Sequence, residues 1–160
     1  MLTLGIDPGT AITGFGLITQ KNDKLQFIDC GVIRTSASES ASDRLRRIYK
    51  ELKHLLVQYK PNCMAVEKLF FGKNTKTAMK VSQARGIILL AAAELGITVA
   101  EYSPQEVKIA MTGYGKADKN QIQQMVKILL GLSFIPKPDD AADALAIAIC
   151  HQHSHKLLSV

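Results

Sequence analysis

The stretch LTLGIDPGTAITGFGLIT, residues 2–19, decides the fold of this chain. Apolar side chains alternate with polar or small ones in residues 2–7, which is the period-two pattern of a β-strand. The PGT turn follows, and residues 13–19 predict a second strand whose glycines allow close approach by another segment. After the turn signal KND, residues 25–35 predict a third strand. Because short turns join these strands, they are expected to form an antiparallel meander.

The rest of the chain alternates between helical and strand patterns. Apolar spacing and helix start and stop signals predict helices at about 45–59, 75–95, 104–112, 119–130 and 139–151. Short apolar runs predict two more strands, at 63–67 and 97–102. A meander followed by strands with helical crossovers gives an α/β protein with a five-stranded mixed sheet flanked by helices. The length favours one domain, residues 1–153, with a flexible tail at 154–160.

Acidic residues stand at the ends of two expected strands and at the start of the last helix. Asp7 ends the first strand and Glu67 ends the fourth, so they become neighbours if these strands pair. The segment PDDAADALA, residues 138–146, begins the last helix, and its Asp140 and Asp143 lie on one helix face. If that helix covers the same edge of the sheet, four carboxylates converge there.

Each of these acids also has an ordinary structural interpretation. Asp139 or Asp140 can be a helix N-cap, Asp7 a turn residue, and Glu67 a surface residue. The placement of all four acids at such element ends favours a common site instead. A cluster of carboxylates raises their pKa values and needs a cation, and oxygen-only ligands favour Mg²⁺ or Mn²⁺ over zinc. Two such ions can activate a water and stabilise the leaving oxygen of a phosphodiester.

The composition is compatible with an enzyme that acts on nucleic acid. Lys and Arg total 20 against 14 Asp and Glu, which gives a net charge of +6 and a pI near 9.3. A basic surface favours polyanions, although it can also serve solubility alone. No segment has the roughly 18 uninterrupted apolar residues of a membrane span. The N-terminus lacks a signal-type pattern and the three cysteines are widely spaced, so we expect a cytoplasmic protein with reduced thiols.

Four stretches of the sequence form a distinctive set of motifs, in this order along the chain: GIDPGTAITGFG, AVEKLFFGKN, KVSQARG and DDAADALAIAI. Together with EYSPQEVK and GKADKNQIQ, they make the chain resemble the RuvC family of crossover junction endodeoxyribonucleases, which resolve Holliday junctions. The resemblance implies an RNase H-like fold and a Mg²⁺ cofactor, with Mn²⁺ as a substitute and two ions per active site. It assigns the catalytic, metal-binding positions to Asp7, Glu67, Asp140 and Asp143. Some family members carry His at the third position, and Asp139 is an extra acid beside it.

The same resemblance implies residues that contact DNA. Phe70 lies where the family has an aromatic residue at the unpaired centre of the junction, and stacking on a phenyl ring tolerates any base. Lys108 and Lys119 occupy positions linked to phosphate binding or catalysis. Further phosphate contacts are expected from Lys73, Arg85 and Lys116. The ordinary alternatives are that Phe70 or Phe71 packs the following helix against the core and that the lysines are simply solvated. Phosphate contacts would make binding fall steeply with salt.

The long helix carries a separate indication of how the protein assembles. Its second half, GIILLAAAEL, is apolar nearly all round, so it must be covered on more than one side. One side faces the sheet, and the other is covered either by helices of the same chain or by a second copy, which Gly86 would allow to approach closely. A two-fold dimer also suits a nearly symmetric four-way junction. The resemblance implies a homodimer that works with the RuvA and RuvB branch-migration proteins.

The expected function is therefore a structure-selective endonuclease of recombination and DNA repair. It makes paired symmetric nicks in strands of like polarity and leaves 5′-phosphate and 3′-hydroxyl ends. One alternative is an actin-like ATPase or sugar kinase, because DPGT between two strands looks like the phosphate loop of that class. The other is a non-catalytic junction-binding module, which would not need four acids. The alternating His151, His153 and His155 could bind zinc, but we assign them no catalytic role.

Overall fold

A five-stranded mixed sheet forms the centre of the computed structural model, which describes residues 1–69 and 75–158. Its strands are β1 (Leu2–Asp7), β2 (Ile12–Lys21), β3 (Lys24–Arg34), β4 (Cys63–Glu67) and β5 (Thr98–Tyr102). The strand order is β3-β2-β1-β4-β5, with antiparallel pairing through β1, β2 and β3 and parallel pairing of β4 with both β1 and β5. The expected meander and the mixed sheet are confirmed.

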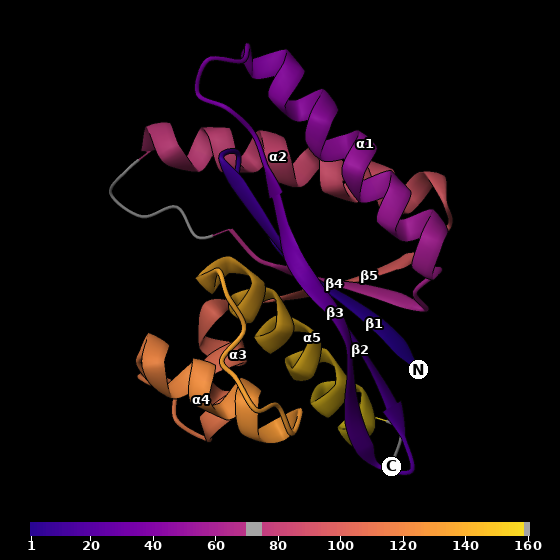
Figure 1. Cartoon of the computed structure of the whole chain (residues 1–160), viewed down its shortest axis with the longest axis vertical. Coiled ribbons are helices and arrows are strands. Elements are labelled where there is room, and N and C mark those ends of the chain that lie inside the picture. Colours follow the sequence, from indigo (N-terminus) through magenta and orange to yellow (C-terminus); the bar gives the residue numbers. More distant parts are fainter. Residues whose placement is uncertain (70–74, 159–160) are drawn as a thin grey trace.

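Helices cover both faces of this sheet. They are α1 (Ala41–Tyr59), α2 (Thr75–Glu94), α3 (Pro104–Thr112), α4 (Lys119–Leu129) and α5 (Asp139–Leu158). The first two lie on one face and the last three on the other (Figure 1). Side chains of β1 alternate between the faces, so Leu4 and Ile6 point into the core under α1 and α2. Each face therefore has its own apolar core.

Local signals in the sequence set where the helices near the site begin. Ser103 and Glu106 form a capping box at the start of α3, and Pro104 occupies its first turn. Asp118 and Gln121 form a second capping box at the start of α4. Both helices consequently begin at fixed points along the chain. This places Lys108 within α3, and Lys119 at the first residue of α4.

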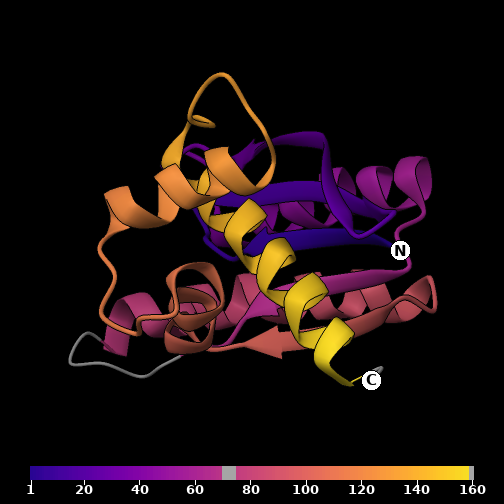
Figure 2. The same ribbon diagram turned by 90° about the horizontal axis from the view of Figure 1, so that it is seen from below.

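Glycines on β1 and β2 allow α5 to lie directly on the sheet. A Cβ at Gly5 would lie 2.0 Å from the carbonyl oxygen of Ala144, and a Cβ at Gly14 would lie 2.0 Å from that of Asp140. Real side chains cannot occupy such positions, so only glycine permits this approach. Figure 2 shows α5 crossing the sheet, with the C-terminus of the chain near its far end. The start of α5 is thereby held against β2.

The last helix is longer than the sequence predicts, because α5 continues to Leu158 rather than ending near residue 151. The polar residues at the expected end of this helix have partners in the sheet. His151 Nδ1 lies 2.9 Å from the hydroxyl of Tyr102, and Gln152 donates to Thr3 Oγ1 at 2.8 Å. These contacts anchor the helix at residues 151 and 152, beyond which it continues. None of the described helices combines the length and the hydropathy needed to cross a membrane.

Candidate active site

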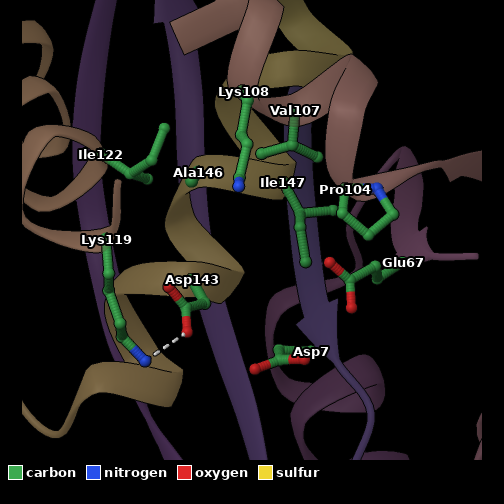
Figure 3. A pocket seen from close by; sticks show the side chains of 10 residues that line it. All are labelled: Asp7, Glu67, Pro104, Val107, Lys108, Lys119, Ile122, Asp143, Ala146 and Ile147. Atoms are coloured by element: carbon green, nitrogen blue, oxygen red, sulfur yellow. Dashed lines mark ion pairs between the residues drawn. The ribbon is translucent and has the colours of Figure 1, made fainter. Parts of the chain in front are cut away.

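Asp7 and Glu67 lie side by side at one edge of the sheet. Strands β1 and β4 pair in parallel, with Ile6 opposite Val66, so the two acids that follow these residues are neighbours. The condition on which the sequence argument depended, pairing of the first and fourth strands, is therefore met. Figure 3 shows both carboxylates directed toward a common space.

The start of α5 brings two more acids to this edge. Asp140 lies in its first turn, where its carbonyl oxygen packs on Gly14 of β2. Asp143 comes one turn later and lines the same space as Asp7 and Glu67. Asp140 is not part of that lining, but its charge reaches Asp7. All four predicted acids thus gather at one place, with Asp140 more peripheral than the other three.

These acids open into a cavity of about 260 Å³ between the sheet and the helices α3, α4 and α5. Its polar lining consists of Asp7, Glu67, Asp143, Lys108 and Lys119. Its apolar wall consists of Pro104, Val107, Ile122, Ala146 and Ile147. An apolar wall lowers the local dielectric constant and so strengthens interactions between the charges. The sequence analysis did not find this wall, although the regular spacing of apolar residues in α3 and α4 indicated that these helices pack on the core.

Burial and mutual repulsion change the pKa values of the acids in the cavity. The pKa of Asp7 is raised from 3.8 to about 7, first by burial and then by the charges of Glu67, Asp143 and Asp140. Burial, followed by the charge of Asp143, also raises the pKa of Glu67. The pKa of Asp143 is raised by burial although its contact with Lys119 acts in the opposite direction. A cation that binds among these carboxylates would stabilise their ionised forms.

The donor set fits a hard divalent cation. Asp7, Glu67, Asp140 and Asp143 offer carboxylate oxygens alone, which are the ligands of Mg²⁺ and Mn²⁺. A divalent ion would also relieve the repulsion that raises the pKa of Asp7. Within residues 1–69 and 75–158, however, no three His, Cys, Asp or Glu side chains stand close enough to hold a metal ion as they are now arranged. Binding of one metal ion by three of these carboxylates would therefore require them to turn toward one another.

Two lysines lie beside the acids. Lys108 extends from α3 with its Nζ directed into the cavity (Figure 3). Lys119 Nζ lies 3.1 Å from Asp143 Oδ2 and 3.5 Å from Asp139 Oδ2. Burial lowers the pKa of Lys119, but its contacts with the two acids outweigh this effect and raise it. Both residues predicted to act on phosphate therefore lie at the acidic site.

The remaining predicted DNA contacts fall elsewhere. Arg85 of α2 forms an ion pair with Glu101 of β5, and Lys116 is exposed in the loop between α3 and α4. Neither lines the acidic cavity. The internal ion pair gives Arg85 a structural role that the sequence analysis did not foresee. Phe70 and Lys73 lie outside the described residues, so their proposed roles stay predictions.

The chain matches known proteins over nearly its whole length. Residues 3–151 match the family model described as crossover junction endodeoxyribonuclease RuvC. A protein of that name from Desulfitobacterium hafniense (strain DSM 10664 / DCB-2) is 57% identical over 99% of this chain and 96% of its own length. One from Roseiflexus sp. (strain RS-1) is 53% identical over 98% of this chain and 93% of its own length. The Thermus thermophilus RuvC solved in complex with a Holliday junction substrate has a TM-score of 0.94 and 38% identity, over 99% of this chain and 97% of that one.

Proposed function

We propose that this chain, which belongs to the RuvC family of crossover junction endodeoxyribonucleases, uses the acidic cavity to cut Holliday junctions. The observation that carries the proposal is the pairing of Asp7 with Glu67 in a partly apolar cavity, where Asp143 and two lysines join them. Structural roles such as a turn or a cap do not need acids gathered from three separate elements. We propose that the reaction serves recombination and DNA repair and takes place in the cytoplasm.

The chain's own residues account for most of what the reaction requires. Asp7, Glu67, Asp140 and Asp143 would hold Mg²⁺, or Mn²⁺ in its place, at two ions per site. Bound there, the ions supply an activated water and stabilise the leaving oxygen of the phosphodiester. Lys108 and Lys119 provide positive charge for the phosphate as its own negative charge increases. The apolar wall lowers the local dielectric constant, which strengthens these interactions. The products are 5′-phosphate and 3′-hydroxyl ends.

Charge supports DNA as the substrate. The net charge of the chain is +6 although the proposed site is acidic, so the basic residues lie mostly outside it. We assign phosphate contacts to Lys73, Arg85 and Lys116, and base stacking at the centre of the junction to Phe70. Use of Arg85 would require its ion pair with Glu101 to open or to lie at the edge of the DNA. Shape and charge, rather than base sequence, then select the junction.

An exposed stripe on α2 supports a homodimer. Its members recur at spacings of three and four residues: Met79, Gln83, Gly86, Leu90 and Ala93. Leu90 is 50% exposed, and a Cβ at Gly86 would meet no atom within 4 Å, so the stripe is open to a second helix. A symmetric pair of subunits would give one cavity for each of the two cuts in strands of like polarity. RuvA and RuvB are the further partners that the family suggests.

The acidic environment argues against the ATPase or sugar-kinase alternative. In that class, the DPGT segment would have to cradle a phosphate. Here Asp7 of that segment lies among other carboxylates, which repel a phosphate unless a cation intervenes.

Incubation with a synthetic four-way junction in Mg²⁺, with and without EDTA, tests the proposal. We expect nicked, ligatable duplexes in Mg²⁺ only, and a linear duplex of the same sequence should stay intact. ATP hydrolysis without DNA cleavage would favour the ATPase alternative. Junction binding with no cleavage in either Mg²⁺ or Mn²⁺ would favour a non-catalytic binding module.

A further inference from the structure

Lys119 lies between two acids of the same helix. Its Nζ is 3.1 Å from Asp143 and 3.5 Å from Asp139, and these acids are four residues apart on one face of α5. Figure 3 shows one oxygen of Asp143 directed at Lys119 rather than at Asp7 or Glu67. The ammonium group therefore neutralises an acid that the proposed function assigns to metal binding.

A metal ion and Lys119 would compete for Asp143. An ammonium group and a divalent cation bound to one carboxylate repel each other, most strongly where the surroundings are apolar. This competition agrees with the finding that, in the described part of the chain, no three acids are arranged to hold a metal ion. For Asp143 to turn Oδ2, the oxygen that Lys119 contacts, toward a cation shared with Asp7 and Glu67, Lys119 has to release it.

Asp139 offers Lys119 an alternative partner close by. One of its oxygens accepts a hydrogen bond from Lys137 at 2.8 Å, and the other faces Lys119. Gln123 of α4 also contacts this carboxylate. Asp139 does not line the cavity, and its side chain is 45% exposed. It is thus a fixed carboxylate just outside the site, and it is not among the four acids assigned to the metal.

We propose that Asp139 is a positioning residue that takes over Lys119 when a cation binds at Asp143. The exchange keeps the lysine at the rim of the cavity, where the proposed function needs its charge. It also lowers the cost of freeing Asp143. This inference rests on the proposed function, because it assumes that the cavity binds a divalent cation.

Binding of Mn²⁺ to the DNA-free protein, followed by the EPR signal of free Mn²⁺, tests the exchange in a double-mutant cycle. The variants are Asp139→Asn, Lys119→Met and the combination of both. Asn can replace Asp at a helix start, so α5 should still form. In the wild-type background, Asp139→Asn should weaken Mn²⁺ binding about twofold to fivefold, as expected for a partly exposed ion pair. In the Lys119→Met background, Asp139→Asn should have no further effect on Mn²⁺ binding, because no lysine is left that could move from Asp143 to Asp139.

Equal weakening in both backgrounds would overturn the exchange, since Asp139 would then act through its own charge or through the fold. Unchanged Mn²⁺ binding in Asp139→Asn alone would also overturn it. Lys137→Met is the matched control, because it removes the other lysine partner of Asp139 but leaves Lys119 in place. It should bind Mn²⁺ as the wild type does. Asp7→Asn separates the two claims: if it too binds Mn²⁺ normally, the proposed function fails, whereas weak binding together with an additive cycle refutes only the exchange.

Discussion

Asp7 and Glu67 are neighbours because Ile6 pairs with Val66 across two parallel strands. After burial, the charge of Glu67 is the largest cause of the raised pKa of Asp7, which reaches about 7. A carboxyl group with that pKa holds its proton in the metal-free protein up to nearly neutral pH. The fold therefore places Asp7 where its ionised form is unfavourable without a cation. The cost in the free energy of folding should be measurable.

The first prediction concerns stability without divalent ions. Asp7 has a pKa of 3.8 when unfolded and about 7 when folded, so the folded state binds its proton more tightly. The resulting stabilisation is complete below pH 3.8 and is lost as the pH rises to about 7. In the Asp7→Asn variant this side chain is neutral at every pH, so it undergoes no such loss of stability. The variant should therefore become increasingly more stable than the wild type as the pH rises over this range. At about 1.4 kcal/mol per pKa unit, the difference has an upper bound of about 4 kcal/mol.

Thermal melting in EDTA from pH 4 to pH 8 measures this difference. Asp118→Asn is the matched control, because Asp118 is an exposed N-cap whose role Asn can also fill. It should not gain stability relative to the wild type as the pH rises. The absence of such a gain in Asp7→Asn would show that Asp7 is not protonated near neutral pH.

A second prediction concerns the contact between Gly14 and α5. In Gly14→Ala, the new methyl group would lie 2.0 Å from the carbonyl oxygen of Asp140, so the start of α5 has to move away. We expect a loss of about 1–3 kcal/mol in the free energy of unfolding, as for other overpacked sites. Because Asp140 and Asp143 move with the helix, Mn²⁺ binding should weaken at least tenfold.

Chemical unfolding and Mn²⁺ titration of Gly14→Ala give both quantities. Gly86→Ala is the control for Mn²⁺ binding, since Gly86 lies on α2, on the face of the sheet opposite α5. It should leave Mn²⁺ binding unchanged. Normal Mn²⁺ binding by folded Gly14→Ala would mean that this glycine does not position the acids.

A third prediction concerns the exposed stripe on α2. Replacing Leu90 with Lys places a charge at the centre of the proposed dimer interface, where it would be buried without a partner. Light scattering after size-exclusion chromatography should then give the mass of one chain, whereas the wild type gives twice that mass. Paired cutting of the junction should change to single nicks, because the two cavities are no longer held together.

Ile128→Lys serves as the control for Leu90→Lys, because Ile128 of α4 is an equally apolar residue and is 66% exposed. It should remain dimeric. If Leu90→Lys also remains dimeric, the subunits associate through another surface.

Local patterns were sufficient to predict the strands, most of the extent of the helices, and the gathering of the four acids at one edge of the sheet. The alternation in residues 2–7 and the helical spacing of Asp140 and Asp143 are properties of short segments. Contacts between segments that are distant in the sequence cannot be recognised from a pattern within either segment. The extension of α5 depends on contacts of His151 with Tyr102 and of Gln152 with Thr3.

The electrostatic partners were equally hidden from the sequence. A phosphate contact of Arg85 stays a prediction. Its ion pair with Glu101 of β5, which the sequence did not indicate, depends on the packing of α2 beside the sheet. The position of Lys119 between Asp139 and Asp143 depends on how α4 docks against α5. Charge is a property of a residue, but the choice of its partner is a property of the fold.

Single-turnover cleavage of a four-way junction by Asp7→Asn tests the central claim most directly. The variant keeps the size of the side chain but cannot provide a carboxylate for the cation. With excess protein in Mg²⁺, we expect cleavage to fall at least a thousandfold, while the affinity for the junction, measured by gel shift without divalent ions, stays within a factor of two or three. Cleavage by Asp7→Asn at the wild-type rate would contradict the assignment of the acidic cavity as the catalytic site.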